Sequence, residues 1–462
     1  MKGNEPLEYF FNARNIALVG VSNKEGKMGN LFLRRIKKDF HGEIYPVHPT
    51  EKKILGLTSY REIAAIPSPI DLVVPLIPQE QLLPLVESCA NGQVKFLLAI
   101  PSGFGELPRG GKIIEKNLVR LAKERGMRVV GPNSLGMFNC LYGLNASMAP
   151  ELPQGAPGFS CVTQSGGFGM AVTMYAQNHH MQMAKFCDLG NTSDVEINEI
   201  LEYFCQDQET RIVGIFLESI PDPKRFITET SLLAKKKPLI FTKIGRTPAG
   251  GRASFTHIGL PSVGVEGLDR KIIHAHTGLE MLHIAKGLTW QPLPRGRKVG
   301  ILTGSGGLGA ELTDLCIEHG LKVPKFSKLL QKALRPFLPS YASVTNPIDL
   351  TPLWWEFPKI YPPLIHMLLS SPEIDLLIIT IIDVATTVEG LMHAVVEAVP
   401  NGTQTGDYLL KPIYVYWASP HSTLKNMRIL EDGHIPCYQS TLETARVAAA
   451  ISRYGNNVRT AG

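Results

Sequence analysis

The sequence has few of the features that mark a membrane protein or a secreted one. Its apolar runs are short, and prolines interrupt the most continuous of them, Val73–Leu83, so no run is long enough to span a bilayer. Polar residues such as Asn12 and Arg14 break the N-terminal segment before it could form the hydrophobic core of a leader. We therefore expect neither a membrane segment nor an export signal.

Paired cysteines and blocks of basic residues are also missing. The seven cysteines are scattered and form no CxxC pair, which predicts a reduced, cytoplasmic protein without a disulfide framework or a metal site. The net charge is +6 with a pI near 8.8, and no basic run favours nucleic acid. Such a mild positive charge suits small anionic metabolites. No Walker A motif, GxxxxGK[ST], is present, so this type of nucleotide site is not expected.

What the sequence does contain is a long alternation of strand and helix patterns. A chain of 462 residues is too long for one core, and 44% hydrophobic with 19% charged residues is ordinary for globular domains. The alternation predicts an α/β protein made of three doubly wound, parallel-sheet domains of the Rossmann or flavodoxin type. We place these domains at residues 1–150, 151–292 and 293–462. Proline-rich stretches at 144–157 and 290–298 are the predicted linkers.

The first domain opens with a strand, a glycine-containing turn and a helix. The strand is IALVGV (16–21), the turn is SNKEGKMGN, and the helical pattern is LFLRRIKKDF. Backbone N–H groups at such a helix start attract phosphate. The spacing is not GxGxxG, so the long turn favours a bulkier phosphate ligand over a dinucleotide. A tight turn without a ligand is the alternative.

Further strands are predicted at 43–49, 70–78, 94–104 and 127–139, with helices at 80–90 and 111–125 between them. In an open parallel sheet the carboxyl ends of the strands line the ligand crevice. The predicted crevice residues are Pro49, Pro78, Ser102, Gly103, Asn133 and Ser134.

The second domain repeats this pattern with a strand at 159–163 and a helix at 168–180. Between them, Ser165-Gly166-Gly167 forms a small anion site at a helix start, although the motif alone is weak. Asp194 precedes a helical pattern and is expected to cap it. Glu218 ends the strand at 211–220, where it is either functional or an ordinary surface residue.

An apolar strand at 238–241 leads into the loop GRTPAGGRASFTHIG (245–259). Its small residues allow a close approach of the backbone to a ligand, and Arg246 and Arg252 add charge that suits phosphate. His257, near the end of this loop, suits the handling of a phosphoryl group. The alternative is a glycine-rich surface loop with a structural histidine.

The third domain contains Gly304, Gly306 and Gly309, which match the dinucleotide pattern GxGxxG. That pattern also requires an acidic residue about 20 positions later, at the end of the second strand. The segment LKVPKFSKLL has none, so NAD is not expected. Buried strands are predicted at 375–383 and 410–419, and a helix closes the chain.

Several of these segments together resemble one family. FFNARNIALVGVSNKEGKMGN, GPNSLGMFN, KFCDLGNTSDVEINEILEYFCQD and ASVTNPIDLT are similar to segments of the NDP-forming acyl-CoA synthetases. This group includes the ADP-forming acetyl-CoA synthetases and is related to the α subunit of succinyl-CoA synthetase. The resemblance covers nearly the whole chain and is weak at 258–285.

The resemblance implies an acid–thiol ligase that interconverts acyl-CoA, phosphate and ADP with a carboxylic acid, CoA and ATP. His257 is the implied phosphohistidine, and Glu218 orients it. Phosphate is implied to contact Ser165, Gly166, Gly167 and Arg246. The implied CoA contacts are Gly20, Ser22, Lys24, Gly26, Met28, Pro49, Pro78, Ser102 and Asn133.

This chain departs from the family pattern at three places. The family's Val-Asn-Pro-Lys is Val47-His48-Pro49-Thr50 here, and Lys52 or Lys53 is the possible substitute for the missing lysine. Ile258 replaces a threonine beside the histidine, and the segment 260–285 differs. His276, in a His-Thr-Gly sequence, ranks second as the phosphohistidine because no Gly-Arg loop precedes it.

Fused family members continue into an ATP-grasp domain, whereas the printed sequence stops at Gly462. The resemblance therefore implies a separate ATP-grasp β subunit that holds ADP or ATP with Mg²⁺, in an α2β2-like assembly. Two alternatives stay open: a CoA-binding regulatory or scaffold protein with an impaired phosphate relay, and a nicotinamide-dependent oxidoreductase.

Overall fold

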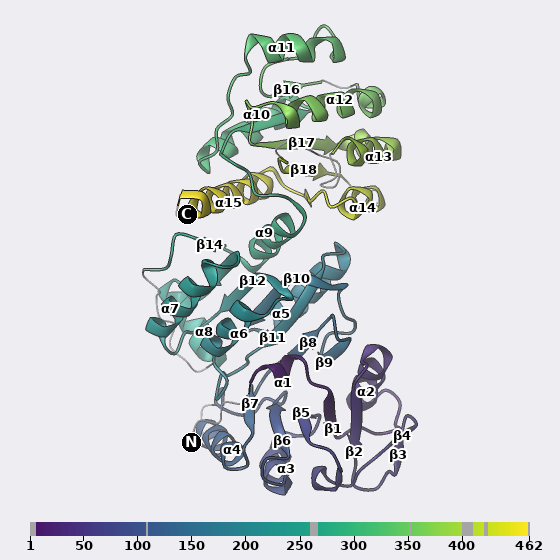
Figure 1. Ribbon diagram of the computed structural model, residues 1–462, viewed down its shortest axis with the longest axis vertical. Coiled ribbons are helices and arrows are strands. Elements are labelled where there is room, and N and C mark those ends of the chain that lie inside the picture. Colours follow the sequence, from purple (N-terminus) through teal and green to yellow (C-terminus); the bar gives the residue numbers. More distant parts are fainter. Residues whose placement is uncertain are drawn as a thin grey trace. The chain divides into compact units, whose positions relative to one another are not determined.

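Three mostly parallel sheets with helices on their faces make up the protein, which confirms the predicted α/β fold class (Figure 1). The computed structural model describes residues 6–107, 110–258, 267–350, 353–399, 410–419 and 424–460, with the backbone alone at 254–258 and 383. The chain divides into two compact units, Met1–Ile272 and Ile273–Gly462. The first unit holds the first two sheets except the last two residues of the strand at Ile272–His274, which belong to the second unit together with the third sheet. The three predicted domain boundaries stay a prediction.

The first sheet has the order β2-β1-β5-β6-β7, and its paired strands run parallel. Its strands are β1 (Asn15–Val19), β2 (Glu43–Val47), β5 (Ile70–Pro75), β6 (Val94–Leu98) and β7 (Arg128–Val130). The helices around it are α1 (Glu8–Phe11), α2 (Met28–Asp39), α3 (Leu82–Ser88) and α4 (Gly111–Glu124). A small hairpin, β3 (Lys53–Ile54) and β4 (Leu57–Thr58), follows β2.

Both faces of this sheet are buried, which explains why its strands read as continuous apolar runs. On one face Ile16 and Leu18 pack in the same core as α1 and α2. On the other face Ala17 and Val73 pack in the same core as α3 and α4. Alternate residues of each strand therefore support different helices.

The second sheet has the order β14-β13-β12-β10-β11-β8-β9. Its strands are β8 (Gly136–Asn139), β9 (Leu144–Ser147), β10 (Gly155–Thr163), β11 (Met183–Asp188), β12 (Thr210–Leu217), β13 (Leu239–Lys243) and β14 (Ile272–His274). The helices that follow these strands are α5 (Gly166–Asn178), α6 (Ile197–Gln206), α7 (Pro223–Ala234) and α8 (Pro248–Ile258). Strands β8 and β9 are antiparallel to their neighbours, as an edge hairpin allows.

Two sequence predictions about the junction of these sheets are wrong. The stretch 127–139 is not one strand, because the chain leaves the first sheet after β7 and enters the second at β8. The expected linker at 144–157 contains β9 and the start of β10. One apolar core extends from α1 and α2 to β8, β10 and α6, so these two sheets form a single unit.

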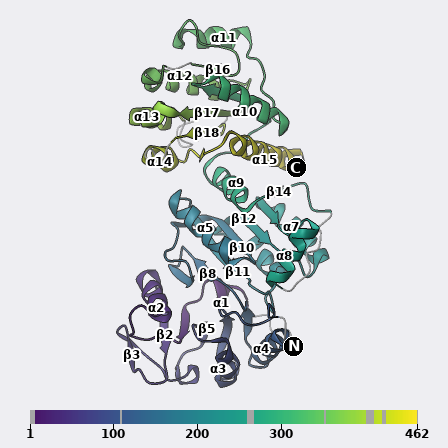
Figure 2. The same ribbon diagram turned by 180° about the vertical axis from the view of Figure 1, so that it is seen from behind.

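The second unit contains the sheet β16-β15-β17-β18-β19, whose paired strands run parallel. Its strands are β15 (Val299–Thr303), β16 (Ile348–Asp349), β17 (Leu376–Ile382), β18 (Ile413–Ala418) and β19 (Cys437–Tyr438). Its helices are α9 (Gly278–Trp290), α10 (Gly306–Glu318), α11 (Lys328–Leu334), α12 (Phe357–Ser370), α13 (Glu389–Ala398), α14 (Leu424–Asp432) and α15 (Thr441–Thr460). Helices α12, α13 and α14 lie on one side of this sheet, and α10 and α15 lie on the other (Figures 1 and 2). The described part of the chain also has 3-10 turns at Ile63–Ala65, Gln79–Gln81, Arg335–Phe337, Trp354–Glu356 and Asp383–Thr387.

All three sheets contain the same five-strand order. If strands β10 to β14 of the second sheet and the strands of the other two sheets are numbered along the chain, each sheet reads 2-1-3-4-5, as β2-β1-β5-β6-β7 does. In this order the second and third strands lie on opposite sides of the first strand. Ligands bind at the carboxyl ends of the strands at this switch point. The topology therefore directs attention to the segments after β1 and β5 and to those after β10 and β12. Within the described residues, no helix is both long and apolar enough to cross a membrane.

A buried ion-pair network connects the ends of the two sheets in the first unit. Asp194 was expected to cap a helix, but Glu196 caps α6 together with Glu199. Asp194 instead accepts hydrogen bonds from Arg128 Nε at 2.9 Å and from the Val129 N–H at 2.8 Å. Arg128 also donates to Glu199, and these two carboxylates raise the pKa of Arg128 although burial opposes them. The ion pair between Arg128 of β7 and Asp194, which follows β11, therefore stabilises the contact between the two sheets.

Replacing Asp194 by Asn should destabilise the first unit by about 3 kcal/mol, because it leaves a buried guanidinium with half of its charge compensation. Hydrogen exchange of β7 and α6 should accelerate. All four tryptophans, at 290, 354, 355 and 417, lie in the second unit, so the fluorescence-detected unfolding of that unit is an internal reference. Glu25→Gln, which removes an ion pair with Arg34 on the surface, should cost less than about 1 kcal/mol. Equal effects of the two substitutions would contradict this account.

Candidate functional site

The crevice of the first sheet is built by close contact of backbone segments at its switch point. Gly20 follows β1 with φ +84°, and a Cβ there would lie 2.5 Å from the carbonyl oxygen of Leu76, after β5. A Cβ on Gly29, in the first turn of α2, would lie 2.5 Å from the carbonyl oxygen of Gly20. Only glycine at both positions lets the helix start approach the two strand ends so closely.

The turn between β1 and α2 is held in place by two asparagines. Asn23 donates to the carbonyl of Lys53 at 2.8 Å and accepts from the Leu55 N–H at 3.0 Å. Asn30, which is buried, donates to the carbonyl of Ser22 at 2.8 Å. No side chain caps the N-terminus of α2, so its first N–H groups face the turn. This is the arrangement that binds phosphate groups at helix starts.

The structure places the sequence-predicted CoA residues at one edge of the first sheet. Gly20, Ser22, Lys24, Gly26 and Met28 lie between the end of β1 and the start of α2, and Pro49, Pro78, Ser102 and Asn133 follow β2, β5, β6 and β7. Lys24, Gly26, Pro49, Pro78 and Ser102 are exposed. Since all five strands are parallel, these segments share the carboxyl edge of the sheet. Their contacts with CoA stay a prediction.

In the second sheet, three neighbouring strands end in the predicted phosphate and catalytic segments. β10 leads to Ser165, β12 leads to Glu218, and β13 leads to Arg246, and β12 lies between the other two strands. Ser165 is the N-cap residue of α5, and its side chain does not cap the helix. Glu218 is buried, with 3% of its surface exposed, directly after its strand. It is therefore not an ordinary surface residue.

Gln164 connects these strand ends and was not predicted from the sequence. Its side-chain oxygen accepts the N–H groups of Glu218 at 3.0 Å and Ser219 at 2.9 Å, and its amide donates to Thr192 Oγ1 at 3.1 Å. Gln164 is 2% exposed. One side chain therefore fixes the backbone after β12 relative to the turn that begins at Ser165.

Lys243 also links two strand ends, and the sequence did not predict this role. Its Nζ donates to the carbonyls of Glu218 and Ile244, both at 2.6 Å. Burial lowers the pKa of Lys243 to about 8, and the carboxylate of Glu218 opposes that shift. The ammonium group thus adds positive charge beside Glu218 and binds the ends of β12 and β13 together. A lysine at the end of a strand carries no sequence signal of this role.

The predicted loop at 245–259 is wrong for most of its length. Residues 248–258 form helix α8, with Pro248 as its first residue, and Thr247 Oγ1 accepts the Gly250 N–H at 3.0 Å. Arg246 and Arg252 are exposed. The backbone of His257 lies in the last turn of α8, and its side chain lies outside the described residues, as do residues 259–266. The role of His257 stays a prediction.

The strand ends of the first sheet and the turn at Gln164 and Ser165 in the second sheet are joined through the turn after β11. Asn133 donates to Asn191 at 3.3 Å, and Asn191 donates to Glu106 and Glu115, both at 2.8 Å. Burial alone would raise the pKa of Glu106, but hydrogen bonds from Asn191 and from backbone N–H groups lower it overall. Thr192, next to Asn191, binds Gln164. Two hydrogen bonds, joined by the peptide bond between Asn191 and Thr192, therefore link Asn133 to Gln164.

The second strand of the third sheet is not at 321–330, where the sequence pattern predicts it. The strand beside β15 is β16, and it ends in Asp349 rather than in the segment 321–330. Asp349 lies close to the turn, because a Cβ on Gly306 would be 2.8 Å from its Oδ2. Gly309 packs α10 against Thr303 of β15, with 2.8 Å between a built Cβ and Thr303 Cγ2. The segment 321–330 indeed has no acidic residue, but the second strand lies later in the chain and ends in Asp349.

Comparison with known proteins identifies the relatives of this chain. It is 32% identical over 464 residues to the α subunit of acetate–CoA ligase [ADP-forming] II from Pyrococcus furiosus, covering 98% of both chains. Over 351 residues it is 32% identical to the acetate–CoA ligase [ADP-forming] of Methanocaldococcus jannaschii, covering 74% of this chain and 49% of that protein. The chain belongs to the family of ADP-forming acetate–CoA ligases.

Solved structures and domain families agree with this membership. Acetyl-coenzyme A synthetase 1 of Ca. Korarchaeum cryptofilum, determined in complex with phosphate and ADP, superimposes with a TM-score of 0.88 at 28% identity over 98% of this chain and 97% of that chain. Residues 14–139 match the CoA binding domain family, and residues 156–266 match the succinyl-CoA ligase like flavodoxin domain. Residues 299–461 match the Ligase-CoA domain. The resemblance found in the sequence to ADP-forming acetyl-CoA synthetases is confirmed.

The pKa of Lys243 tests whether its ammonium group is buried beside the carboxylate of Glu218. Nuclear magnetic resonance of the lysine side chains should give Lys243 a pKa of about 8. Because the carboxylate of Glu218 stabilises the ammonium form, Glu218→Gln should lower this pKa further. Glu229→Gln, a change on α7, should leave it unchanged. A Lys243 pKa near the ordinary 10.4, or one insensitive to Glu218, would refute the described arrangement.

Proposed function

We propose that this chain is the α subunit of an ADP-forming acyl-CoA synthetase. The reversible reaction converts acyl-CoA, phosphate and ADP into a carboxylic acid, CoA and ATP. One observation carries the proposal: the strand ends of the first sheet and the turn at Ser165 of the second lie in one unit. The hydrogen bonds Asn133–Asn191 and Thr192–Gln164, on either side of the Asn191–Thr192 peptide bond, link them. A thioester held by the first site and a phosphate held by the second could therefore react.

CoA binds in the crevice of the first sheet. The uncapped start of α2 and the exposed Lys24 suit its phosphate groups, and the turn is fixed before the ligand arrives. Pro49 and the strand ends at Pro78, Ser102 and Asn133 line the rest of the same edge. The match of residues 14–139 to a CoA binding domain family supports this assignment.

Calorimetry of the full chain with CoA should show binding at this crevice. Lys24→Ala should weaken binding about tenfold by removing one charged phosphate contact, whereas Lys116→Ala, on the exposed face of α4, should not. Gly26 has φ +75° and open space around its Cα, so Gly26→Trp strains the turn and fills the ligand side. It should weaken binding more than Lys24→Ala does. Absence of CoA binding by the unmodified chain would end this assignment.

The chemistry proceeds in three balanced steps. Phosphate attacks the thioester carbonyl, so that the C–S bond breaks and acyl phosphate and CoA form. The imidazole of His257 then attacks phosphorus, and the carboxylic acid leaves as its anion. Finally a phosphate oxygen of ADP attacks the phosphohistidine and yields ATP and free His257. The covalent intermediate keeps the energy of the thioester in a P–N bond.

The residues of the second sheet have separate roles in these steps. The N-terminal N–H groups of α5 at Ser165, Gly166 and Gly167 bind phosphate oxygens, as helix starts do. Arg246, after β13, adds positive charge, and Glu218 holds the imidazole of His257 in one tautomer so that the other nitrogen can attack. Gln164 and Lys243 are positioning residues, because they fix the backbone that carries Glu218.

A separate subunit supplies the nucleotide site. The Pyrococcus furiosus relative that this chain covers to 98% is named as a subunit α, which supports a partner in the active enzyme. We infer an ATP-grasp β subunit that binds ADP or ATP with Mg²⁺, in an α2β2-like complex. All seven cysteines are unpaired, which fits a reducing compartment such as the cytoplasm.

Labelling with radioactive phosphate and acetyl-CoA tests the relay in the presence of the partner subunit. His257→Ala should abolish an acid-labile, base-stable label, and Glu218→Gln should slow its formation on the order of a hundredfold, because the imidazole loses the group that orients it. His393→Ala, an exposed change on α13, serves as the matched control. Label that persists in His257→Ala and disappears in His276→Ala would transfer the role to His276. Binding of CoA without any label would instead indicate a regulatory homologue.

A further inference from the structure

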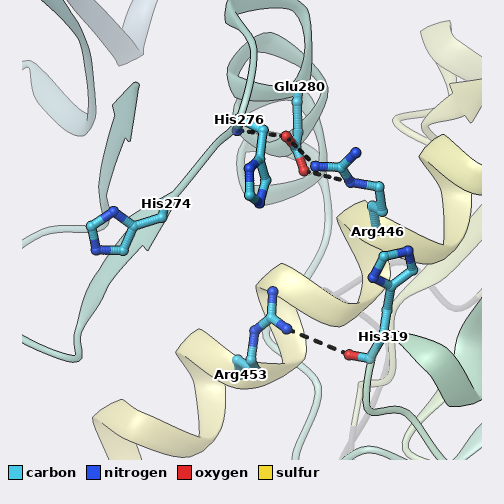
Figure 3. A pocket seen from close by; sticks show the side chains of 6 residues that line it. All are labelled: His274, His276, Glu280, His319, Arg446 and Arg453. Carbon is cyan, nitrogen blue, oxygen red and sulfur yellow. Dashed lines mark hydrogen bonds and ion pairs between the residues drawn. The ribbon is translucent and has the colours of Figure 1, made fainter. Parts of the chain in front are cut away.

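The second unit contains a cavity whose lining is mostly cationic or imidazole. Its volume is about 110 Å³, and it is lined by His274, His276, Glu280, His319, Arg446 and Arg453 (Figure 3). A volume of this size holds several water molecules, which is enough for one small ion but not for a nucleotide. All six residues belong to the unit Ile273–Gly462, apart from the site proposed above.

Four elements of secondary structure bring these side chains together. His274 ends β14, His276 lies just before α9, and His319 is the C-cap residue of α10. Arg446 and Arg453 are seven residues apart on α15, so both lie on the same face of that helix. Figure 3 shows His276 and Arg453 pointing toward one another from opposite sides of the cavity.

The single lining carboxylate is already engaged by one arginine. Arg446 donates to Glu280 through Nε at 3.0 Å and through Nη2 at 2.9 Å. The backbone N–H of His276 donates to the same carboxylate at 2.6 Å. Arg453, in contrast, donates to the neutral carbonyl of His319 at 3.4 Å. Glu280 acts on the charge of Arg453 only from a distance, and the printed hydrogen bond of Arg453 within the cavity wall goes to a neutral oxygen.

The cationic groups of the cavity also disfavour one another. Desolvation and the charge of Arg297 lower the pKa of Arg453, Glu280 opposes this in part, and Arg446 lowers it further. Desolvation, Arg446 and Arg453 lower the pKa of His319, and Glu318 and Glu280 oppose this only in part. Desolvation and His276 lower the pKa of His274. A negative ion in the cavity would relieve these repulsions.

We propose that this cavity is a binding site for a small phosphate-class oxyanion. The guanidinium of Arg453 offers directed N–H donors that match phosphate oxygens, and the imidazoles add donors when they are protonated. Arg446 is held in place by Glu280 and contributes charge from the same helix face. The site does not depend on the chemistry assigned to His257.

Anion binding and protonation of the histidines must be coupled. A bound anion stabilises the imidazolium forms of His274 and His319, so the pKa values of these two residues rise when the site is filled. By linkage, the same anion binds more tightly as the pH falls through those pKa values. Glu280 and Glu318 face the same histidines and reduce the effect, while Arg297, Arg446 and Arg453 increase it.

The test follows the imidazole resonances of the full chain during a pH titration with and without inorganic phosphate at constant ionic strength. The signals are assigned by substituting His274, His276 and His319 singly with Gln, so the readout is specific to this cavity. Phosphate should raise the pKa of His319 by about one unit. Arg453→Gln should abolish most of the rise, Arg453→Lys should keep part of it, and Arg428→Gln on α14 should not change it.

Three outcomes would overturn the proposal. The first is no change of these imidazole signals on addition of phosphate, which would make the cluster a structural clamp between α9, α10 and α15. The second is an equal rise in the wild type and in Arg453→Gln. The third is an equal rise with acetate, which would show a general ionic effect instead of recognition of a phosphate-class ion.

Discussion

The side chain of Gln164 holds together the ends of two neighbouring strands, and the candidate site depends on it. Its oxygen accepts two backbone N–H groups after β12, and its amide reaches the turn after β11. Removing a buried amide that accepts two N–H groups is costly, because each buried N–H group left unpaired lowers the stability of the protein by about 1–3 kcal/mol. The backbone at Glu218 and the turn at Ser165 are thus fixed relative to each other before any ligand binds.

The strand order allows Gln164 to reach the ends of both neighbouring strands. In the order 2-1-3-4-5 the first strand lies between the second and third, and β10 occupies that place in the second sheet. The residues after β10 therefore meet those after both neighbours, β11 and β12. Gln164 is the residue directly after β10, so one side chain can reach both strand ends. Lys243 extends the same network to β13.

The sequence predicts the fold class and most strands because both faces of these sheets are buried and the strands are apolar throughout. It does not predict which sheet a strand joins, as β8 shows, since that depends on contacts distant in sequence. Asp194 was misread for the same reason, because its partner Arg128 lies 66 residues away. The small residues of 248–258 suggest a loop, but this segment is a helix. Pro248 at its first position and its alanines also favour a helix.

Two segments of the chain repeat the same backbone arrangement and differ in the residue that could join the turn to the next strand end. In each, a threonine ends a strand and binds the N–H of the following serine, at 2.9 Å in Thr163–Ser165 and 3.0 Å in Thr303–Ser305. A helix begins at the next glycine in both. The residue between threonine and serine is Gln164 in the first segment and Gly304 in the second. Glycine has no side chain with which to join the turn to the next strand end, so an equivalent backbone alone does not produce an equivalent site.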